Sequence, residues 1–446
     1  MKFVRIQKGY NLNIQGEPSS EVEELSSPER VAVLPERIPF VKPRLLVEVG
    51  DNVKVGTALF EDKRNADLKF LSPGGGEVAE INFGPRRVIR EVVINLDKEE
   101  TYEQFEAVDP EHLEKIKREH LIQIIMRGGL WPLIRELPFR DIARPTYQPP
   151  AILVSLDAKE PFQPLPEIYL KGNRDLFEYG INILRKLTNN VYVSTIRNNE
   201  AVLKELNGLV THTYSGKYPA DDPGVLLYYT KKSSDENHAW YVMGQDVLLL
   251  ARLLLSAAYP TERMVVLAGS LATKRMHLKT RMGVPLDHIA TGRTDNGRTR
   301  YVTGGVFRGY PGSKESYLGF YETSLTLIPE GKEREMLAFV RPGFNKPSYS
   351  RTFLSFFNKA GLSMDCNLHG GRRACIACGY CTEICPVDIL PQLTYKSIFA
   401  EDVDESLAHG LLDCVECGLC SYVCPSKIEL FATIKAARTA YYKEQT

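Results

Sequence analysis

The side chains with the clearest capacity for chemistry are eight cysteines that occur in two runs of identical spacing. Each run has the form C-x₂-C-x₂-C-x₃-C-P, and the runs are residues 375–386 and 414–425. The two-residue gaps let three thiolates point inward from one tight turn, which the proline ends because it lacks an N–H and fixes φ. Such closely spaced thiolates are the typical ligands of a [4Fe–4S] cube.

The spacing resembles that of bacterial ferredoxins, in which the fourth cysteine of each run ligates the cluster of the other run. The resemblance implies two [4Fe–4S] clusters in one compact unit, close enough for electrons to pass between them. It also implies two ligand sets: Cys375, Cys378, Cys381 and Cys424 for the first cluster, and Cys414, Cys417, Cys420 and Cys385 for the second.

Zinc and disulfides are the alternatives for cysteines at this density. A structural zinc site is typically built from two separated C-x₂-C pairs, without a third cysteine at the same spacing or a fourth before proline. Disulfides are disfavoured because no signal peptide is visible. The ninth cysteine, Cys366, stands alone and is interpreted as a packed thiol. Arg372 and Arg373, just before the first run, would either raise the potential of its cluster or form a solvated loop.

The composition is that of a globular protein with several domains. With 446 residues, 43% hydrophobic and 25% charged, the chain is expected to form about two to four domains. The net charge of zero gives no reason to expect nucleic acid as a partner. No apolar run approaches the roughly 20 residues of a membrane span, so membrane association is expected to go through a partner.

Residues 1–40 are polar and are predicted to form an irregular leading segment. Short β-branched strands follow from Leu45 to Leu96, separated by Gly and Asn turns, which predicts a small β-barrel or sandwich over residues 1–100. The residue pattern resembles that of biotinyl/lipoyl-type domains, which have a barrel-sandwich hybrid fold. The turn that would carry the modified lysine lacks flanking methionines, so Lys63 is interpreted as a surface lysine.

A predicted helix over residues 112–126 leads into a glycine-rich turn that contains Arg127, Gly128 and Gly129. The turn resembles the flavin-phosphate loop found in the flavoprotein of complex I and in the C component of the Rnf complex. Those loops have small residues where this chain has Leu130 and Trp131, and this bulk argues against FMN. A quinone is a second candidate ligand, in a cleft near Gly129, Trp131 and Phe139, although both aromatic rings are more simply explained as core.

Strands alternate with helices through residues 101–257, which predicts a Rossmann-like α/β domain with a largely parallel sheet. Strands are expected at 151–155 and 191–195, a helix lies between them at 175–187, and the alternation continues through 225–230 and 245–257. No G-x-G-x-x-G follows any strand. Residues 258–338 resemble a soluble-ligand-binding β-grasp (SLBB) domain, and helical spacing around the cysteines predicts an α-helical ferredoxin domain over residues 339–446.

Several collinear stretches together resemble the NqrA family, which belongs to the Na⁺-translocating NADH:quinone reductase. They are IQKGYNL (6–12), GLWP followed by Arg135 and Pro138-Phe139, GKYPA (216–220), QDV (245–247), TER (261–263), PGFNK (342–346) and RTFLS (351–355). The familiar members of this family keep only remnants of the cysteine runs, whereas this chain retains eight ligands, like the C component of the Rnf complex. The fold class implied is multidomain α+β.

The resemblance implies an electron-transfer subunit that is peripheral to the bacterial inner membrane on its cytoplasmic side. Its partners would be the membrane and flavoprotein subunits of the same respiratory complex, and electrons would move through two [4Fe–4S] clusters towards quinone. Two alternatives remain open. One is an Rnf-like subunit that binds NADH and FMN, and the other is an assembly subunit whose clusters are structural.

Overall fold

A computed structural model describes residues 1–445 except 296, 332–336, 338–339, 341, 346, 351–352 and 369. Four residues of the family-like connector (Arg341, Lys346, Arg351 and Thr352) and the predicted boundary at 338/339 therefore lie outside the described residues. No helix within the described part of the chain is both long enough and apolar enough to cross a membrane.

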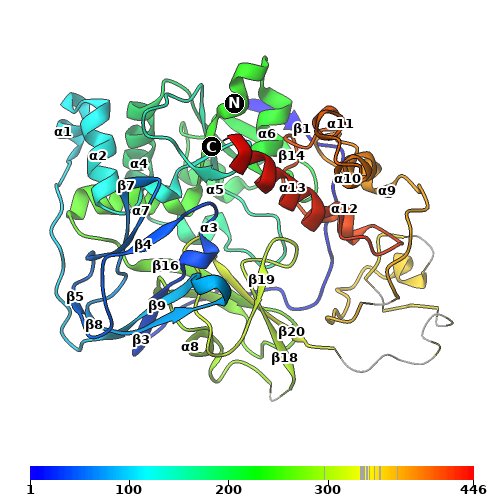
Figure 1. Ribbon diagram of the computed structural model, residues 1–446, viewed down its shortest axis with the longest axis horizontal. Helices are drawn as coiled ribbons and strands as arrows, with labels where there is room; N and C mark the ends of the chain where they lie inside the picture. Colours follow the sequence, from blue (N-terminus) through cyan, green and yellow to red (C-terminus); the bar gives the residue numbers. More distant parts are fainter. Residues whose placement is uncertain are drawn as a thin grey trace.

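The N-terminal barrel consists of two small antiparallel sheets that pack face to face (Figure 1). Inward-facing apolar side chains of both sheets fill it, with Phe60 stacked on Phe70 at its centre. Lys63 lies exposed in the turn between β6 and β7, as expected. One sheet contains β3 (Arg30–Val33), β9 (Ile89–Leu96), β8 (Gly76–Phe83) and β5 (Asn52–Val53), and the other β4 (Pro43–Leu45), β6 (Ala58–Asp62) and β7 (Asn65–Leu71).

The α/β domain is built on a seven-stranded sheet in the order β1-β14-β13-β12-β15-β10-β11. Its central strands β12 (Ile152–Ser155), β13 (Val191–Ile196), β14 (His212–Ser215) and β15 (Trp240–Met243) are parallel. At the edge, β10 (Arg135–Glu136) and β11 (Asp141–Ile142) run antiparallel.

Helices cover both faces of this sheet, because successive strand residues point to opposite sides and both sides are apolar. Ile152 and Val154 face the core that contains α4 (Arg174–Leu187) and α7 (Gly244–Ser256), while Leu153 faces α6 (Pro223–Thr230). Both segments in which the alternation was expected to continue are helices, and the strand between them is β15. The other helices are α1 (Pro110–Lys115), α2 (Arg118–Arg127), α3 (Pro166–Tyr169) and α5 (Glu200–Glu205).

The third domain is a six-stranded mixed sheet in the order β19-β18-β20-β16-β17-β2. Its central strands enclose an apolar core with the short helix α8 (Leu286–Ala290). The strands are β16 (Glu262–Ala268), β17 (Met276–Arg281), β18 (Thr299–Thr303), β19 (Tyr310–Gly312) and β20 (Ser324–Pro329).

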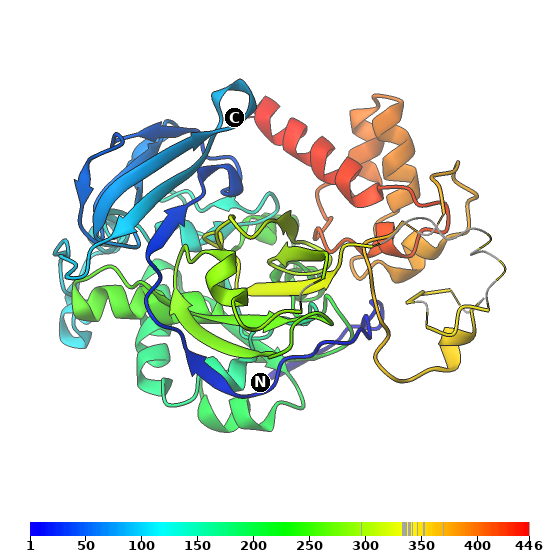
Figure 2. The same cartoon turned by 90° about the horizontal axis from the view of Figure 1, so that it is seen from below.

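The first 40 residues differ from the irregular segment that the sequence predicted. Strand β1 (Lys2–Arg5) pairs in parallel with β14 of the α/β sheet, and β2 (Val22–Glu24) pairs in parallel with β17 of the third domain. Figure 2 shows this dark blue segment running along the molecule from one sheet to the other. The reason is that exposed sheet edges offer unpaired N–H and C=O groups, which even polar strands can satisfy.

The C-terminal part of the chain is helical and lies at one side of the molecule (Figure 1). The last helix crosses towards the barrel, where Tyr442 contacts Phe40 edge-to-face and donates a hydrogen bond to Asp141. The helices are α9 (Tyr380–Ile384), α10 (Pro391–Phe399), α11 (Val403–Ala408), α12 (Leu419–Tyr422) and α13 (Leu430–Gln445).

Candidate metal centre

The eight cysteines of the two runs surround two cavities. The first cavity receives three thiols from the first run and one from the second, namely Cys375, Cys378, Cys381 and Cys424. The second receives three thiols from the second run and two from the first, namely Cys414, Cys417, Cys420, Cys385 and Cys381, so Cys381 borders both cavities.

The two runs have the same local backbone conformation. The residue before the second cysteine is left-handed in both, at Ala377 (φ 53°) and Glu416 (φ 55°). The residue after it is a left-handed glycine, Gly379 or Gly418, from which the short helices α9 and α12 begin. Glycine adopts positive φ without steric cost. These turns bring three closely spaced thiols of each run to one side.

The two sites differ in exposure, and we call them the outer and inner sites. Cys375 and Cys378 of the outer site are exposed to solvent. Cys385 and Cys417 of the inner site are buried in an apolar cluster that also contains Tyr218 of the α/β domain. The inner site therefore lies against the body of the protein.

The surroundings of the inner thiols act on the thiolate form in two opposite ways. Burial raises the pKa of the Cys385 thiol to about 11, while the backbone N–H groups of Val387 and Ile389 oppose that rise. Backbone N–H groups that point at sulfur stabilise thiolate ligands, and a bound cluster stabilises them further by its positive irons. The donor set therefore fits iron–sulfur clusters. Within the described ranges, no three His, Cys, Asp or Glu side chains are placed to hold one metal ion.

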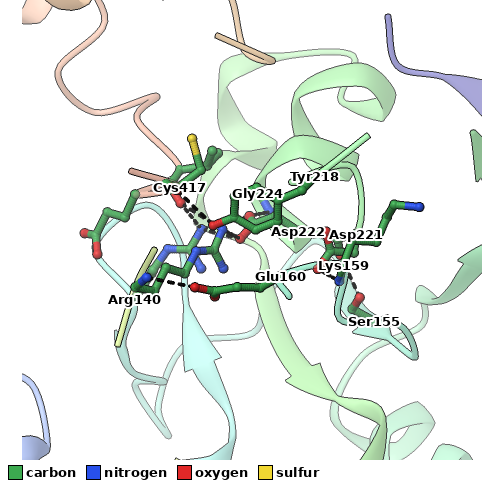
Figure 3. A network of polar contacts seen from close by, with 12 residues as sticks. Arg140, Ser155, Lys159, Glu160, Tyr218, Asp221, Asp222, Gly224 and Cys417 are labelled. Atoms are coloured by element: carbon green, nitrogen blue, oxygen red, sulfur yellow. Dashed lines mark hydrogen bonds and ion pairs between the residues drawn. The ribbon is translucent and has the colours of Figure 1, made fainter. Parts of the chain in front are cut away.

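A group of buried charges lies directly behind the inner site (Figure 3). Arg140 donates to both carboxylate oxygens of Asp222 at 2.8 and 3.0 Å and to the carbonyl of Val415 at 3.0 Å. Arg308 donates to the same carboxylate at 2.7 Å. Although burial alone would raise it, these two arginines lower the pKa of Asp222 to about 2.

Two further side chains hold the backbone of the second cysteine run. Tyr218 donates its hydroxyl to the carbonyl of Cys417 at 2.9 Å. Arg438 of α13 is buried, donates to the carbonyls of Cys414 and Pro138, and pairs with Glu416 at 3.2 Å. The carbonyls at positions 414, 415 and 417 are thus held by side chains from outside the run.

The structure places the predicted glycine-rich turn away from both cavities. Arg127 is exposed at the end of α2, and the turn follows the C-terminal end of that helix. A side chain at Gly128 or Gly129 would collide with Leu253 or Leu71, at 2.3 and 2.4 Å. Phosphate binds at helix N-termini, where backbone N–H groups are free. The turn is therefore filled by the protein's own core and does not fit a flavin phosphate.

Trp131 and Phe139 have structural surroundings in this chain. Trp131 is fully buried, packs edge-to-face on Trp240 and donates its indole N–H to the carbonyl of Ala143 at 2.8 Å. Phe139 packs at a tilt against Tyr442 of α13, with ring centroids 4.5 Å apart. The structure does not bring these two rings together around a cavity.

The crevice at the carboxyl ends of the parallel strands, where α/β sheets usually bind nucleotides, is also occupied by the chain itself. The N-terminus of α7 is covered by Tyr169, whose hydroxyl lies 2.4 Å from a Cβ built on Gly244. Three buried carboxyl groups lie in the loops that follow β12 and β14: Asp157, Glu160 and Asp221. The protein's own buried side chains therefore occupy the edge where a nucleotide would lie.

Comparison with known proteins gives matches along most of the chain. The NqrA N-terminal barrel-sandwich hybrid domain matches residues 4–97, and the NqrA second alpha/beta domain matches residues 116–259. The NqrA protein of the Na(+)-translocating NADH-quinone reductase of Yersinia pestis bv. Antiqua (strain Angola) is 32% identical over 92% of each chain. The chain belongs to the NqrA family. The family resemblance predicted from the sequence is confirmed.

Other matches agree with this membership. The NQRA C-terminal domain, which is the SLBB domain, matches residues 264–311, and a 4Fe-4S dicluster domain matches residues 374–428. The NqrA protein of Vibrio parahaemolyticus serotype O3:K6 is 32% identical over 92% of each chain. A crystal structure of an air-oxidised NAD⁺-reducing [NiFe]-hydrogenase matches 52% of each chain at 12% identity, but its TM-score of 0.34 is too low to support any inference.

Sequence reasoning did not find the buried charges behind the inner site. Asp222 follows the family-like stretch GKYPA by two residues and precedes Pro-Gly, which is a signal for a helix N-cap, and its side chain does accept from the N–H of Gly224. Nothing local marks Arg140 or Arg308 as its partners, because they are 82 and 86 residues away along the chain.

Proposed function

We propose that this chain is the peripheral NqrA component of a Na⁺-translocating NADH:quinone reductase-type complex and relays electrons through two [4Fe–4S] clusters towards quinone reduction. The two cysteine-lined cavities carry this proposal. When bound, the clusters would supply one-electron carriers. The chain itself contributes the eight thiolate ligands, the turns that hold them, and the apolar walls that keep water from the inner site.

The ligand sets proposed are those of the ferredoxin-like spacing. Cys424 would complete the outer site with Cys375, Cys378 and Cys381, and Cys385 would complete the inner site with Cys414, Cys417 and Cys420. The exposed outer site would face the flavoprotein subunit or another soluble donor, and the inner site would face the body of the complex. Partners among the membrane subunits and a position on the cytoplasmic side of the bacterial inner membrane belong to the same proposal.

The proposed domain division is 1–100, 101–257, 258–338 and 339–446, with a Rossmann-like second domain that resembles the complex I flavoprotein subunit. An Rnf-like role in binding NADH and FMN has less support. The glycine-rich turn is filled by Leu71 and Leu253, and buried side chains occupy the carboxyl edge of the parallel sheet. A quinone site at Trp131 and Phe139 has less support as well, because Trp131 is fully buried against Trp240 and Phe139 packs against Tyr442.

The test is anaerobic reconstitution of the full chain with iron and sulfide, followed by assays of iron, FMN and reduction by NADH. We expect about eight irons per chain without flavin. Cys424→Ser should lose the outer cluster and Cys385→Ser the inner one, each leaving about four irons. Cys366→Ser, which changes a thiol outside the two cavities, is the matched control and should keep the full iron content.

Two results would contradict the proposal. If Cys424→Ser and Cys385→Ser each removed both clusters or neither, the crossed ligand sets would be wrong. If the chain held one FMN tightly and its flavin were bleached by NADH, it would be a dehydrogenase component rather than a relay.

A further inference from the structure

We infer that Arg140 and Arg308 are positioning residues that raise the reduction potential of the inner cluster, and that Asp222 holds them in place and partly offsets their charge. This inference rests on the two-cluster function proposed above. It assigns a role to residues outside both cysteine runs. It also implies that the two clusters have different electrostatic surroundings.

The contacts of the two arginines lead directly to the wall of the inner cavity. Arg140 donates to the carbonyl of Val415 at 3.0 Å, and Arg308 approaches the same oxygen at 3.5 Å. Val415 lines the inner cavity and is next to Cys414 in the chain. Both guanidinium groups are therefore one residue away from the inner ligands, on the side of the protein body.

These charges are poorly screened by solvent. The side chain of Arg140 is 11% exposed and that of Asp222 is fully buried. The Nε atoms of both arginines are buried without a hydrogen-bond partner. Two guanidinium groups face one carboxylate, so a positive charge remains in a medium of low dielectric constant, where its effect reaches further than in water.

Other charges around this group change that balance little. Glu416 on the inner run is paired with Arg438 of α13, with Lys435 as a more distant partner. Glu160 accepts hydrogen bonds from the backbone N–H groups of Phe307 and Arg308. Burial raises the pKa of Glu160, and it raises the pKa of Asp221 to about 7, so the Asp221 carboxyl is partly protonated at neutral pH.

The positive groups lie beside the inner ligands. Arg438 donates to the carbonyl of Cys414 and Arg140 to that of Val415. Reduction of a cluster adds one negative charge, so positive groups beside its ligands favour the reduced state. Positive charge near a cluster raises its potential.

The outer site lacks an equivalent buried pair among the described residues. Arg372 precedes its run, as the sequence suggested, but its side chain is 70% exposed and its nearest acidic atom, on Glu429, is 3.7 Å away. Charges at such positions are screened by water and salt. The asymmetry between the two sites therefore comes from the body of the protein, which supplies Arg140 from the α/β domain and Arg308 from the third domain.

The experiment is a potentiometric titration of the reconstituted full chain, followed by EPR, in which the two signals are assigned with the Cys424→Ser and Cys385→Ser variants. Arg140→Gln should make reduction of the inner cluster about tenfold less favourable, which is about 59 mV for one electron. Asp222→Asn should shift the same signal in the opposite direction, because it removes a negative charge while keeping the shape. Arg140→Lys should restore most of the wild-type potential.

The matched control is Arg263→Gln. Arg263 is a buried arginine that also donates to one aspartate, Asp246, and to one backbone carbonyl, that of Phe320, but it lies away from the cysteines. The Arg263→Gln variant should leave the reduction potentials of both clusters unchanged. If Arg140→Gln cannot hold the inner cluster, the direction of the Asp222→Asn shift decides alone.

Shifts of the same sign in Arg140→Gln and Asp222→Asn would overturn the inference, and so would equal shifts of both clusters or no shift. Each of these outcomes would leave the two-cluster function intact. A wild-type chain with fewer than two clusters would instead overturn the proposed function and this inference with it.

Discussion

Asp221 and Asp222 are neighbours in the chain, yet their surroundings shift the pKa values of their carboxyl groups in opposite directions. Asp222 is clamped by Arg140 and Arg308, and its pKa falls to about 2 in spite of burial. Burial raises the pKa of Asp221 to about 7, and only one of its carboxylate oxygens has a hydrogen-bond partner, the N–H of Lys159. One residue thus supplies a permanent charge and the other a group that titrates near neutral pH.

We predict that the Asp221→Asn substitution makes the stability of the folded protein less sensitive to rising pH. The folded-state pKa of Asp221 is above its ordinary value, so the unfolded chain loses this proton first, and stability falls as pH rises from about 4 to about 7. The asparagine variant lacks this loss and should be more stable at pH 8 by up to about 4 kcal/mol, at about 1.36 kcal/mol per pKa unit. Thermal unfolding at pH 5 and pH 8 measures the difference.

The matched variant is Asp222→Asn. Because the pKa of Asp222 is lowered on folding, its contribution to stability is present at neutral pH, and this variant should be less stable than wild type at pH 8. Stabilisation by both variants at pH 8 would contradict the assignment of the two roles.

At the scale of elements, the turn after α2 shows how one glycine-rich motif can serve packing instead of binding. Gly129 has φ +68° and lies against Leu71 of β7, and Gly128 lies against Leu253 of α7. Because these two glycines carry no side chains, the backbone after helix α2 packs directly against β7 of the barrel and α7 of the α/β domain. The Leu130-Trp131 pair then enters the core, where a flavin-binding turn would need open space.

We predict that Gly129→Ala destabilises the chain by about 2–4 kcal/mol, because it combines backbone strain with a collision at Leu71. Gly172→Ala is the matched control. Gly172 has a similar φ of +71° but no atom within 4 Å of a built Cβ, so only the strain should appear, at about 1 kcal/mol. Denaturant or thermal unfolding compares the two, and iron content should stay the same in both. Equal losses would mean that Leu71 makes no difference.

At the scale of the whole molecule, the outer and inner sites are supported by different parts of the chain. The outer cavity is lined only by residues of the C-terminal helical part. The inner site is backed by Tyr218, Arg140 and Arg308, which belong to other domains. Residues 1–24 add strands to two sheets and so help to hold these domains together.

We predict that a chelator under mild oxidation removes iron from the reconstituted protein in two phases. The first half should be lost from the outer site, because Cys375 and Cys378 are exposed, and the second half should be lost more slowly from the buried inner site. Iron release followed by absorbance measures both rates. The Cys424→Ser variant should show only the slow phase. A single phase in the wild-type chain would mean that both clusters are equally accessible.

The sequence by itself determined the local features of this protein. Regular spacing placed the cysteine runs and predicted a strand at residues 151–155, a helix at 175–187 and a strand at 191–195. The structure has these elements at Ile152–Ser155, Arg174–Leu187 and Val191–Ile196, because each depends on side chains that are close along the chain. The collinear stretches established the family.

Only the tertiary structure decided which distant groups meet. It placed Asp222 between Arg140 and Arg308 behind the inner site, added the first residues of the chain to two sheet edges, and filled the glycine-rich turn with Leu71. These contacts join residues from separate domains, and no spacing or composition marks them. They depend on how the domains pack, which local sequence does not specify.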